Sequence, residues 1–268
     1  MENAHTIRVG YYQFAPVFGC VSENRVEIMN FLENIDADLA VLPELPFTGY
    51  GFSNREELLS LAEDPDDSSA VSDLVSLCLR RRMHIVTGFA ERSGEQCFNS
   101  SLLLGPSGIC GTYRKLHLFD REKLYFDPGN LPLKVIDIGG IRIGMMVCFD
   151  WIFPEVARTL AIAGADILCH PANLVLTYCQ QTMLARCIEN MVYSVTANRT
   201  GCEKHSFGDL DFTGTSQIIA PGGDIIHRGD SKNTEAYSVE ISIDRARNKT
   251  ITQRNDVLAD RRPEYYLR

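Results

Sequence analysis

The sequence predicts an α/β protein in which mixed β-sheets alternate with helices. Apolar runs rich in Val and Ile recur along its 268 residues, and longer stretches with helical periodicity lie between them. Several neighbouring apolar runs are separated only by short Gly-containing turns, which indicates antiparallel hairpins rather than a purely parallel sheet. No Gly/Ser-rich or Pro-rich linker divides the chain, so we expect one domain over residues 1–268 with two sheets.

The first half of the chain begins with two expected strands, Ile7–Phe14 and Asp38–Leu42. Between them, Ser22–Ile35 carries apolar residues at i, i+3, i+4 and i+7, which predicts a helix with Ser22 as its N-cap. The sequence GPSG, residues 105–108, is a turn signal. The other elements expected here are helices at Asn54–Leu61 and Ala70–Arg82 and strands at His84–Phe89, Phe98–Leu104 and Ile109–Tyr113.

The second half repeats this pattern. Pro154–Gly164 has Pro and Glu in its first turn and ends at a Gly, as helices often do. The C-terminal tail, residues 244–268, ends in the charged and aromatic sequence DRRPEYYLR, and we expect it to dock on a partner subunit. The remaining expected elements are a hairpin of Leu133–Ile138 and Ile141–Val147, a strand at Asp166–Cys169, a helix at Gln180–Asn190, a strand at Met191–Ala197, a hairpin of Gly214–Ala220 and Asp224–His227, and a strand at Ala236–Ile243.

Composition and charge narrow the function. The formal net charge of −9 repels phosphate backbones, so we expect neither nucleic acid nor an anionic membrane surface as a partner. No run of about 18 apolar residues predicts a membrane span, and the first residues lack a basic segment followed by an apolar one. We therefore expect a cytoplasmic protein whose nine cysteines are reduced and mostly buried.

The sequence predicts no metal or organic cofactor. No two of the nine cysteines stand in a C-x-x-C spacing, and no pair among the six histidines has the spacing of zinc ligands. The glycine-rich loops that cradle phosphates or dinucleotides are absent as well. With no metal or cofactor predicted, the remaining option is catalysis by a nucleophilic side chain, and a cysteine is the obvious candidate for the nucleophile.

Among the nine cysteines, Cys148 has the most suggestive position. It ends the apolar strand IGMMVC and precedes the helix that starts near Pro154. Ligands of open α/β sheets bind where strands end and turn into helices, and nearby helix N–H groups lower the pKa of a thiol. A buried structural cysteine is the alternative reading of the same position.

Two other polar residues lie at the ends of apolar strands. Glu44 follows LAVLP, where desolvation raises a carboxyl pKa towards the range useful for a general base. Lys115 lies in YRKLHLF, where an ammonium is able to stabilise an oxyanion. A solvated turn glutamate and a surface lysine are the respective alternatives. Together with Cys148, the two residues would supply a base, an electrophilic stabiliser and a nucleophile.

The segments PELPFTGY, YRKLHLF and VCFDWIFPE resemble the three catalytic blocks of the nitrilase superfamily of carbon–nitrogen hydrolases. The resemblance continues through EKLYFDPG, HPANL, ARCIENMVY, NRTG and GTSQIIAPGG, so it spans nearly the whole chain in the right order. It implies a four-layer αββα sandwich that pairs into αββα–αββα homodimers or larger assemblies.

The resemblance also assigns roles to residues. It implies that Glu44 is the general base, that Cys148 is the nucleophile and that Lys115 holds the oxyanion together with the backbone N–H of Phe149. Glu122, seven residues before the Gly of the PG pair at 128–129, is expected to orient the substrate amide and the lysine, with a helix-surface glutamate as the alternative. The residues expected to line the pocket are Tyr50, Phe119, Trp151 and Asn173, and the remaining cysteines expected nearest to it are Cys169 and Cys202.

The expected reaction is hydrolysis of a small aliphatic amide to a carboxylic acid and ammonia through a Cys thioester. True nitrilases usually carry C-W-E at the nucleophile, whereas this chain carries C-F-D-W, so a nitrile or an N-carbamoyl amine is the alternative substrate. Arg186 and Arg199 are the candidates for binding a substrate carboxylate. Two other classes stay open: a thiol-rich redox or interaction protein without turnover, and an acyltransferase that passes the acyl group to an amine.

Overall fold

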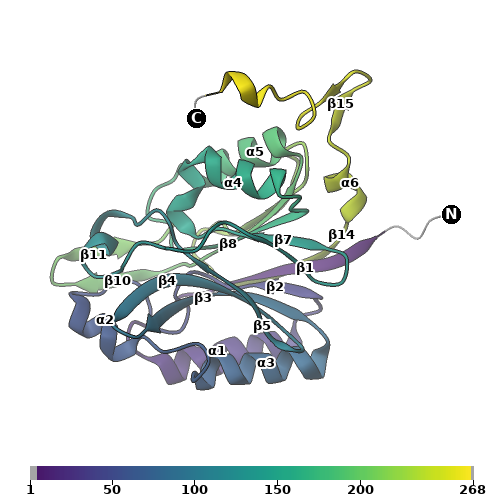
Figure 1. Cartoon of the computed structure of the whole chain (residues 1–268). Helices are drawn as coiled ribbons and strands as arrows, with labels where there is room; N and C mark the ends of the chain where they lie inside the picture. Colours follow the sequence, from purple (N-terminus) through teal and green to yellow (C-terminus); the bar gives the residue numbers. More distant parts are fainter. Residues whose placement is uncertain (1–4, 267–268) are drawn as a thin grey trace.

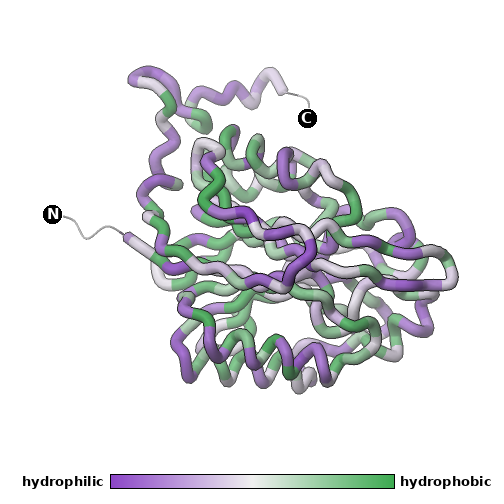
Figure 2. Tube along the Cα trace, turned by 180° about the vertical axis from the view of Figure 1, so that it is seen from behind, coloured by the Kyte–Doolittle hydropathy of each residue, from purple (hydrophilic) through white to green (hydrophobic). Residues whose placement is uncertain are grey.

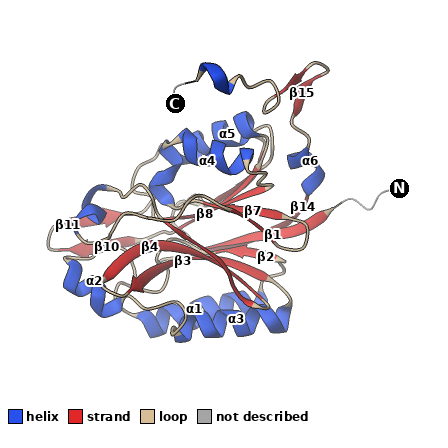
Figure 3. Cartoon of the chain, in the orientation of Figure 1, coloured by secondary structure: helices blue, strands red, loops and turns tan. Residues whose placement is uncertain are grey.

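The computed structural model of the protein describes residues 5–266. Two six-stranded sheets lie face to face in the middle of the molecule, and helices cover the outer face of each (Figure 1). Helices α1 and α3 cover one sheet, and α4 and α5 cover the other (Figure 3). The predicted four-layer αββα sandwich is therefore confirmed.

The first sheet has the strand order β14-β1-β2-β3-β4-β5. Strands β1, β2 and β3 are parallel, and the remaining pairs are antiparallel, so the sheet is mixed as predicted. Its strands are β1 (Thr6–Gln13), β2 (Leu39–Val41), β3 (His84–Ser93), β4 (Gln96–Gly105), β5 (Gly108–Arg114) and β14 (Glu235–Ser242).

The second sheet has the order β13-β12-β9-β8-β7-β6, with a parallel centre of β7, β8 and β9 and antiparallel flanks. Its strands are β6 (Val135–Asp137), β7 (Arg142–Met145), β8 (Ile167–Ala172), β9 (Tyr193–Asn198), β12 (Gln217–Ile219) and β13 (Ile225–Arg228). Two small hairpins lie outside the sheets: β10 (Cys202–His205) with β11 (Gly208–Asp211), and β15 (Thr250–Thr252) with β16 (Asn255–Asp256). The sequence prediction missed both small hairpins.

The helices begin at recognisable caps, with one correction. Asn54 accepts a hydrogen bond from Glu57 N at 2.9 Å, and Ser68 caps α3 in the same way. The prediction that Ser22 caps α1 is wrong, because the helix already begins at Val21 and its N-cap residue, Cys20, makes no side-chain cap bond. The helices are α1 (Val21–Asn34), α2 (Arg55–Leu61), α3 (Ser69–Arg81), α4 (Pro154–Ile162), α5 (Cys179–Asn190) and α6 (Ile243–Arg247), with 3-10 turns η1 (Asp120–Leu124), η2 (Cys148–Ile152) and η3 (Pro263–Tyr265).

The two-residue period of the strands divides the core into layers. In β1, Val9 and Tyr11 belong to the buried cluster between the sheets, whereas Tyr12 packs with α1 and α3 on the outer face. In β2, Val41 faces inward and Ala40 faces outward in the same way. Both faces of these central strands are thus buried, which explains why their sequences read as continuous apolar runs.

The first residues of the C-terminal segment are bound to the rest of the same chain. Arg247 in α6 pairs with the buried carboxylate of Asp166 at 3.3 Å, and Lys249 Nζ donates to the carbonyls of Asn190 and Met191 at the end of α5, at 3.0 and 2.7 Å. Beyond these contacts the segment extends past α4 and α5, and it is largely hydrophilic (Figure 2). Residues 267–268 of the predicted docking tail lie outside the described residues. Within residues 5–266, no helix combines the length and the apolar character that crossing a membrane requires.

Candidate active site

Glu44 lies in the loop that follows β2. Leu42 still pairs with β3 through its N–H to Val86 O at 2.8 Å, and the chain then turns at Leu45, whose φ is 47°. A Cβ on Gly88 of β3 would lie 2.5 Å from Glu44 Cα, so only glycine allows the two backbones to approach this closely. The Glu44 side chain is completely buried.

Lys115 directly follows β5, and its backbone is held from both sides. Its N–H donates to Asn99 O at 2.8 Å, and its carbonyl accepts from Gly129 N at 2.9 Å. A Cβ on Gly129 would lie 2.1 Å from Arg114 O, so this contact also needs glycine. The PG pair recognised in the sequence therefore supports the strand end that carries the lysine.

A continuous hydrogen-bonded chain joins the ammonium of Lys115 to two carboxylates. Lys115 Nζ donates to Glu44 Oε1 at 2.8 Å and to Glu122 Oε1 at 2.7 Å. Tyr50 OH donates to the same oxygen of Glu122 at 2.7 Å, and Phe119 N donates to Glu122 Oε2 at 3.0 Å. Glu122 is fully buried, so the alternative of a helix-surface glutamate is wrong.

Cys148 opens the 3-10 turn η2 with a φ of 42°, a left-handed conformation that is rare for a side chain other than Asn or Asp. The turn is tied down by the buried Asp150. Its Oδ2 accepts from Val147 N at 2.9 Å and from Tyr113 OH at 2.7 Å, and its Oδ1 lies 2.7 Å from His117 Nδ1. These bonds hold the chain in a conformation that would otherwise cost about 1–3 kcal/mol.

A buried histidine supports the same turn from β8. His170 Nε2 lies 2.9 Å from the carbonyl oxygen of Cys148, and Nδ1 lies 3.1 Å from Thr196 Oγ1. Burial lowers the pKa of His170, so the ring is neutral. Because a carbonyl only accepts, Nε2 carries the proton and Nδ1 accepts from the threonine hydroxyl.

The electrostatics of the site explain why the thiol stays protonated. Burial raises the pKa of Cys148 well above the usual thiol value, and the nearby Glu44 carboxylate raises it further. Burial lowers the pKa of Lys115, but Glu122 and Glu44 outweigh that effect, so its pKa is raised and the ammonium stays charged. Burial also raises the pKa of Glu122 against the opposing effect of Lys115. A thiolate would add a second net negative charge to this site, so the proton has to leave as a bond forms.

Three buried oxygen atoms of the site have no hydrogen-bond partner among residues 5–266. They are Glu44 Oε2, Asn99 Oδ1 and Asn173 Oδ1. The other oxygen of Glu44 already accepts from Lys115 and from Asn99 Nδ2 at 2.7 Å, and Asn173 Nδ2 donates to the Glu44 carbonyl at 2.8 Å. Unpaired buried acceptors are costly, and they mark where another molecule would bind.

The predicted residues meet at one place. A narrow cavity of about 10 Å³, with room for roughly one water molecule, opens beside the thiol of Cys148. Glu44, Lys115, Glu122 and Tyr50 do not line it; they form the hydrogen-bonded chain described above. The cavity is lined by Phe119, Cys148, Phe149, Trp151, Asn173, Leu174, Val175 and Leu176.

Four other residues named from the sequence do not line this cavity. Cys169 is buried in β8 and Cys202 is exposed on β10, and neither of these two cysteines, which were expected nearest to the pocket, lines the cavity. Arg186 pairs with Glu189 and donates to the Trp151 carbonyl. Arg199 is buried and pairs with Glu203.

Sequence reasoning missed the residues that hold the reactive groups in place. Asn99, Asp150 and His170 are all buried and polar. Asn99 and His170 lie within strands β4 and β8, and Asp150 lies in the turn η2 that follows β7. A polar residue inside an apolar run is a signal that sequence inspection could have used, because burial of such a group requires a partner. The partner itself is not written in the local sequence.

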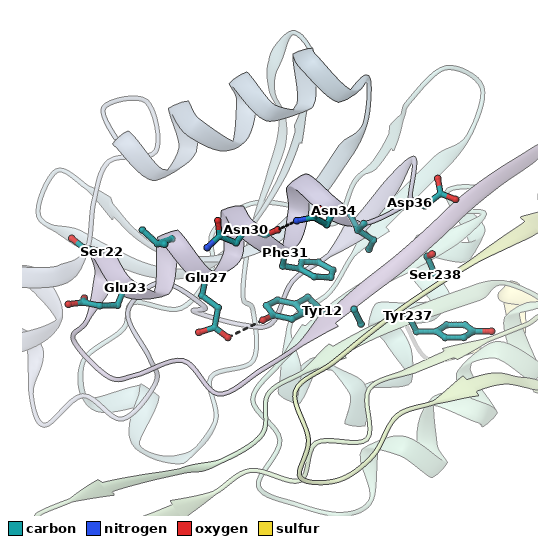
Figure 4. Close-up of a pocket in the computed structure, with 13 residues that line it drawn as sticks. Tyr12, Ser22, Glu23, Glu27, Asn30, Phe31, Asn34, Asp36, Tyr237 and Ser238 are labelled. Carbon is teal, nitrogen blue, oxygen red and sulfur yellow. Dashed lines mark hydrogen bonds between the residues drawn. The ribbon is translucent and has the colours of Figure 1, made fainter.

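A much larger hollow lies elsewhere in the molecule. A groove of about 970 Å³ runs between α1 and the strands β1 and β14. Figure 4 shows Tyr12 and Phe31 on its floor and carboxylates such as Glu27 at its side, with Tyr12 OH donating to Glu27 at 3.0 Å. None of the predicted site residues lines it. Among residues 5–266, no group of three or more His, Cys, Asp or Glu residues is arranged to hold a metal ion.

Comparison with known proteins identifies the class and then the family. The fold is that of a solved carbon–nitrogen hydrolase, a class of enzymes with this arrangement of two sheets. The carbon–nitrogen hydrolase family model matches residues 8–249, and the chain belongs to this family. It is a carbon–nitrogen hydrolase.

Individual relatives support the same assignment. A protein named nitrilase from Pyrococcus abyssi is 40% identical over 265 residues, covering 98% of this chain and 100% of the relative. The crystal structure of a carbon–nitrogen hydrolase from Helicobacter pylori superposes with a TM-score of 0.87 at 25% identity, over 98% of this chain and 97% of the other. An amidase mutant from Nesterenkonia sp., in which the acetamide moiety of fluoroacetamide is covalently added to the active-site cysteine, has the same fold, with a TM-score of 0.79 at 24% identity over 98% and 96% of the two chains.

Proposed function

We propose that this enzyme hydrolyses small, neutral aliphatic amides to a carboxylic acid and ammonia, with Cys148 as nucleophile, Glu44 as general base and Lys115 as oxyanion stabiliser. The observation that carries the proposal is the unpartnered oxygen Oε2 of Glu44, which is buried beside a buried thiol of raised pKa. A base with one free lone pair and a thiol that keeps its proton suit a proton transfer that accompanies attack.

In the first half of the reaction, Cys148 Sγ bonds to the amide carbon while its proton passes to Glu44 Oε2. The carbonyl oxygen gains negative charge as the tetrahedral intermediate forms. Lys115 Nζ and the N–H of Phe149 are the proposed donors to that oxygen. Phe149 lies in the first turn of η2, where backbone N–H groups have no partner within the helix.

In the second half, the C–N bond breaks and Glu44 returns the proton to the leaving nitrogen, which departs as ammonia. The acyl group remains on Cys148 as a thioester. Glu44 then takes a proton from water as the water adds to the thioester carbon. The C–S bond breaks to release the acid, and Glu44 returns that proton to Cys148 Sγ, which restores the thiol and the free carboxylate. We assign to Asn173 Oδ1 the role of accepting a hydrogen bond from the substrate's NH₂ group before ammonia leaves, and its lack of a protein partner supports this role.

The lining of the cavity supports a small and uncharged acyl group. Aromatic and aliphatic side chains dominate it, and it contains neither Lys nor Arg. The two arginines that the sequence offered for a substrate carboxylate are engaged by Glu189 and Glu203. A carboxylate in this cavity would be desolvated without a cationic partner, so amides of dicarboxylic acids are disfavoured.

The alternative substrate is a small aliphatic nitrile, and the name of the Pyrococcus abyssi relative favours it. An N-carbamoyl amine is the further alternative. The test is ammonia release from a matched panel: acetamide and propionamide, the corresponding nitriles, N-carbamoylputrescine and a dicarboxylic acid monoamide. Intact-protein mass spectrometry run in parallel should show an acyl adduct that maps to Cys148. Absence of ammonia from the entire panel would sink the proposal and would favour the non-catalytic reading.

Hydroxylamine added to the same reactions separates hydrolysis from acyl transfer. A hydrolase without an amine site should form mainly the acid at low hydroxylamine concentration. Preferential hydroxamate formation would favour the acyltransferase alternative.

We also propose that the protein acts as a homodimer in the cytoplasm. Large apolar side chains are exposed on and around α4 and α5, including Ile162, Tyr178 and Ile188, and Tyr265 and Tyr266 of the C-terminal segment are exposed nearby. Such surfaces often mark subunit contacts, and nine free cysteines suit a reducing compartment. Light scattering coupled to size-exclusion chromatography should give a dimer mass, and a monomer mass would contradict this proposal.

A further inference from the structure

The hairpin β10–β11 carries a buried carboxylate that binds the loop after β2. Glu203 Oε1 accepts from Tyr50 N at 3.0 Å, and Glu203 Oε2 accepts from Gly51 N at 2.8 Å. One side chain thus binds two consecutive backbone amides that are more than 150 residues away in sequence. Glu203 is 5% exposed, so these bonds form out of contact with bulk water.

The charge of Glu203 is matched by residues that also fix its direction. Arg199 pairs with Oε1, donates to Pro16 O at 2.9 Å and lies over the ring of Phe212 at 4.0 Å. His205 Nε2 lies 3.1 Å from Oε2. The carboxylate is therefore compensated inside the protein, as a buried charge must be.

The loop has glycine where the hairpin approaches most closely. A Cβ on Gly49, whose φ is +78°, would lie 2.9 Å from Glu203 Oε1. A Cβ on Gly51 would lie 2.1 Å from His205 Nε2. The sequence TGYG therefore fits against Glu203 and His205 only with glycine on each side of Tyr50.

Tyr50 connects this contact to the reactive groups. Its N–H is bound by Glu203, and its hydroxyl donates at 2.7 Å to the oxygen of Glu122 that also accepts from Lys115. We propose that Glu203 is a positioning residue, which acts through Tyr50 to hold Glu122 and Lys115 in register with Cys148. This inference rests on the proposed function for the reaction that it affects, and no other step of that mechanism uses Glu203.

A positioning role differs from a purely structural one in a way that can be measured. If Glu203 acts through the Tyr50 hydroxyl, removing that hydroxyl removes most of the effect of changing Glu203. If Glu203 only stabilises the fold, the two changes act independently on turnover, and the loss follows the folded fraction alone.

The test is a double-mutant cycle with E203Q, Y50F and the combined variant, measured as kcat and KM per folded protein. E203Q keeps the size of the side chain but removes the charge that Arg199 faces. We expect E203Q to lower kcat by about tenfold to hundredfold with little change in KM, as for a small misplacement of reacting groups. In the Y50F background, the same change should lower kcat less than about threefold, because the connecting hydroxyl is already gone.

The matched control is D166N. Asp166 is as buried as Glu203 and also pairs with arginines, Arg142 and Arg247, but it contacts no residue of the site. The D166N substitution should reduce stability while leaving kcat per folded protein unchanged. If E203Q does not fold, G51A replaces it, because its methyl group pushes the loop away from His205 with the Glu203 charge intact. Equal fold-losses in the wild-type and Y50F backgrounds, or an unchanged kcat, would overturn the proposal.

A second readout separates this proposal from the proposed function. Peptide mass mapping follows the alkylation rate of Cys148 by iodoacetamide as a function of pH, which requires no turnover. We expect the midpoint of that pH profile to move in E203Q and to stay in place in D166N. If the wild type releases no ammonia, the proposed function fails while this midpoint still decides the role of Glu203. An unchanged midpoint in E203Q then overturns it.

Discussion

Two buried thiols in different regions of the molecule differ in their surroundings rather than in their burial. Cys187 in α5 packs among apolar residues with its Sγ 3.2 Å from Ser194 Oγ, and burial raises its pKa to about 12. Cys148 is also buried with a raised pKa, but Glu44, Lys115 and Glu122 surround it. Burial alone keeps a thiol protonated and inert. A base with an unpartnered oxygen next to the thiol is what the helical region lacks.

The largest difference between the two regions should appear when each thiol is removed. C148A should abolish amide turnover, down to below a few per cent of the wild-type rate, because no other group supplies the nucleophile. C187A should keep turnover and lose about 1–2 kcal/mol of unfolding free energy through the small void that it leaves. Ammonia release and urea unfolding measure the two effects. Comparable losses of activity in both variants would remove the distinction.

The next largest effect tests the base. E44Q keeps the volume of the side chain and a partner for Lys115, but it cannot take the thiol proton. We expect kcat to fall by at least about 100-fold, which is the contribution typical of general-base catalysis. Unfolding of E44Q measured by circular dichroism should remain cooperative, which would show that the lower kcat does not come from a failure to fold. Activity within about tenfold of the wild type would assign the base to another group.

A smaller effect is expected from the residue that holds the nucleophile's turn. D150N loses the charge that Tyr113, His117 and Val147 N share. The left-handed conformation of Cys148 should then relax, and kcat should fall by about tenfold to hundredfold with a smaller change in KM. Steady-state kinetics check this expectation. An unchanged kcat would mean that His170 alone holds the turn.

The contrast between the thiols also explains what the sequence could and could not predict. The positions of Glu44, Lys115 and Cys148 at strand ends follow from local apolar runs, so pattern and resemblance together located them. The surroundings of each group depend on residues distant in sequence: Asn99 bonds Glu44 across 55 positions, and Glu203 bonds Tyr50 across 153. Local periodicity contains no information about such pairs. The hairpin β10–β11 was missed for a related reason, since its exposed residues give no apolar signal.

The smallest effect concerns alkaline stability. Burial raises the pKa of both Cys78 and Cys187 from 9.0 to about 12. Between these values the unfolded chain loses thiol protons that the folded chain keeps, so stability is fully present below pH 9 and falls as the pH rises. The slope is about 1.4 kcal/mol per pH unit for each such thiol. Urea unfolding of C187A across this pH range should show that the unfolding free energy falls less steeply with pH, by the contribution of one thiol. An unchanged slope would mean that groups other than Cys187 cause the loss of stability.

The pairing of β1 with β14 has a consequence for biosynthesis. These strands pair over their full lengths, from Thr6 with Ser242 to Gln13 with Glu235, and the Gln13 side chain also bonds Ser216 N. At roughly 5–20 residues per second, β1 emerges from the ribosome on the order of tens of seconds before β14 exists. During that interval the N–H and C=O groups on the edge of β1 that pairs with β14 are open to other chains and to chaperones. The first sheet can be completed only after nearly all of the chain has been translated, so this enzyme assembles late rather than progressively from its first half.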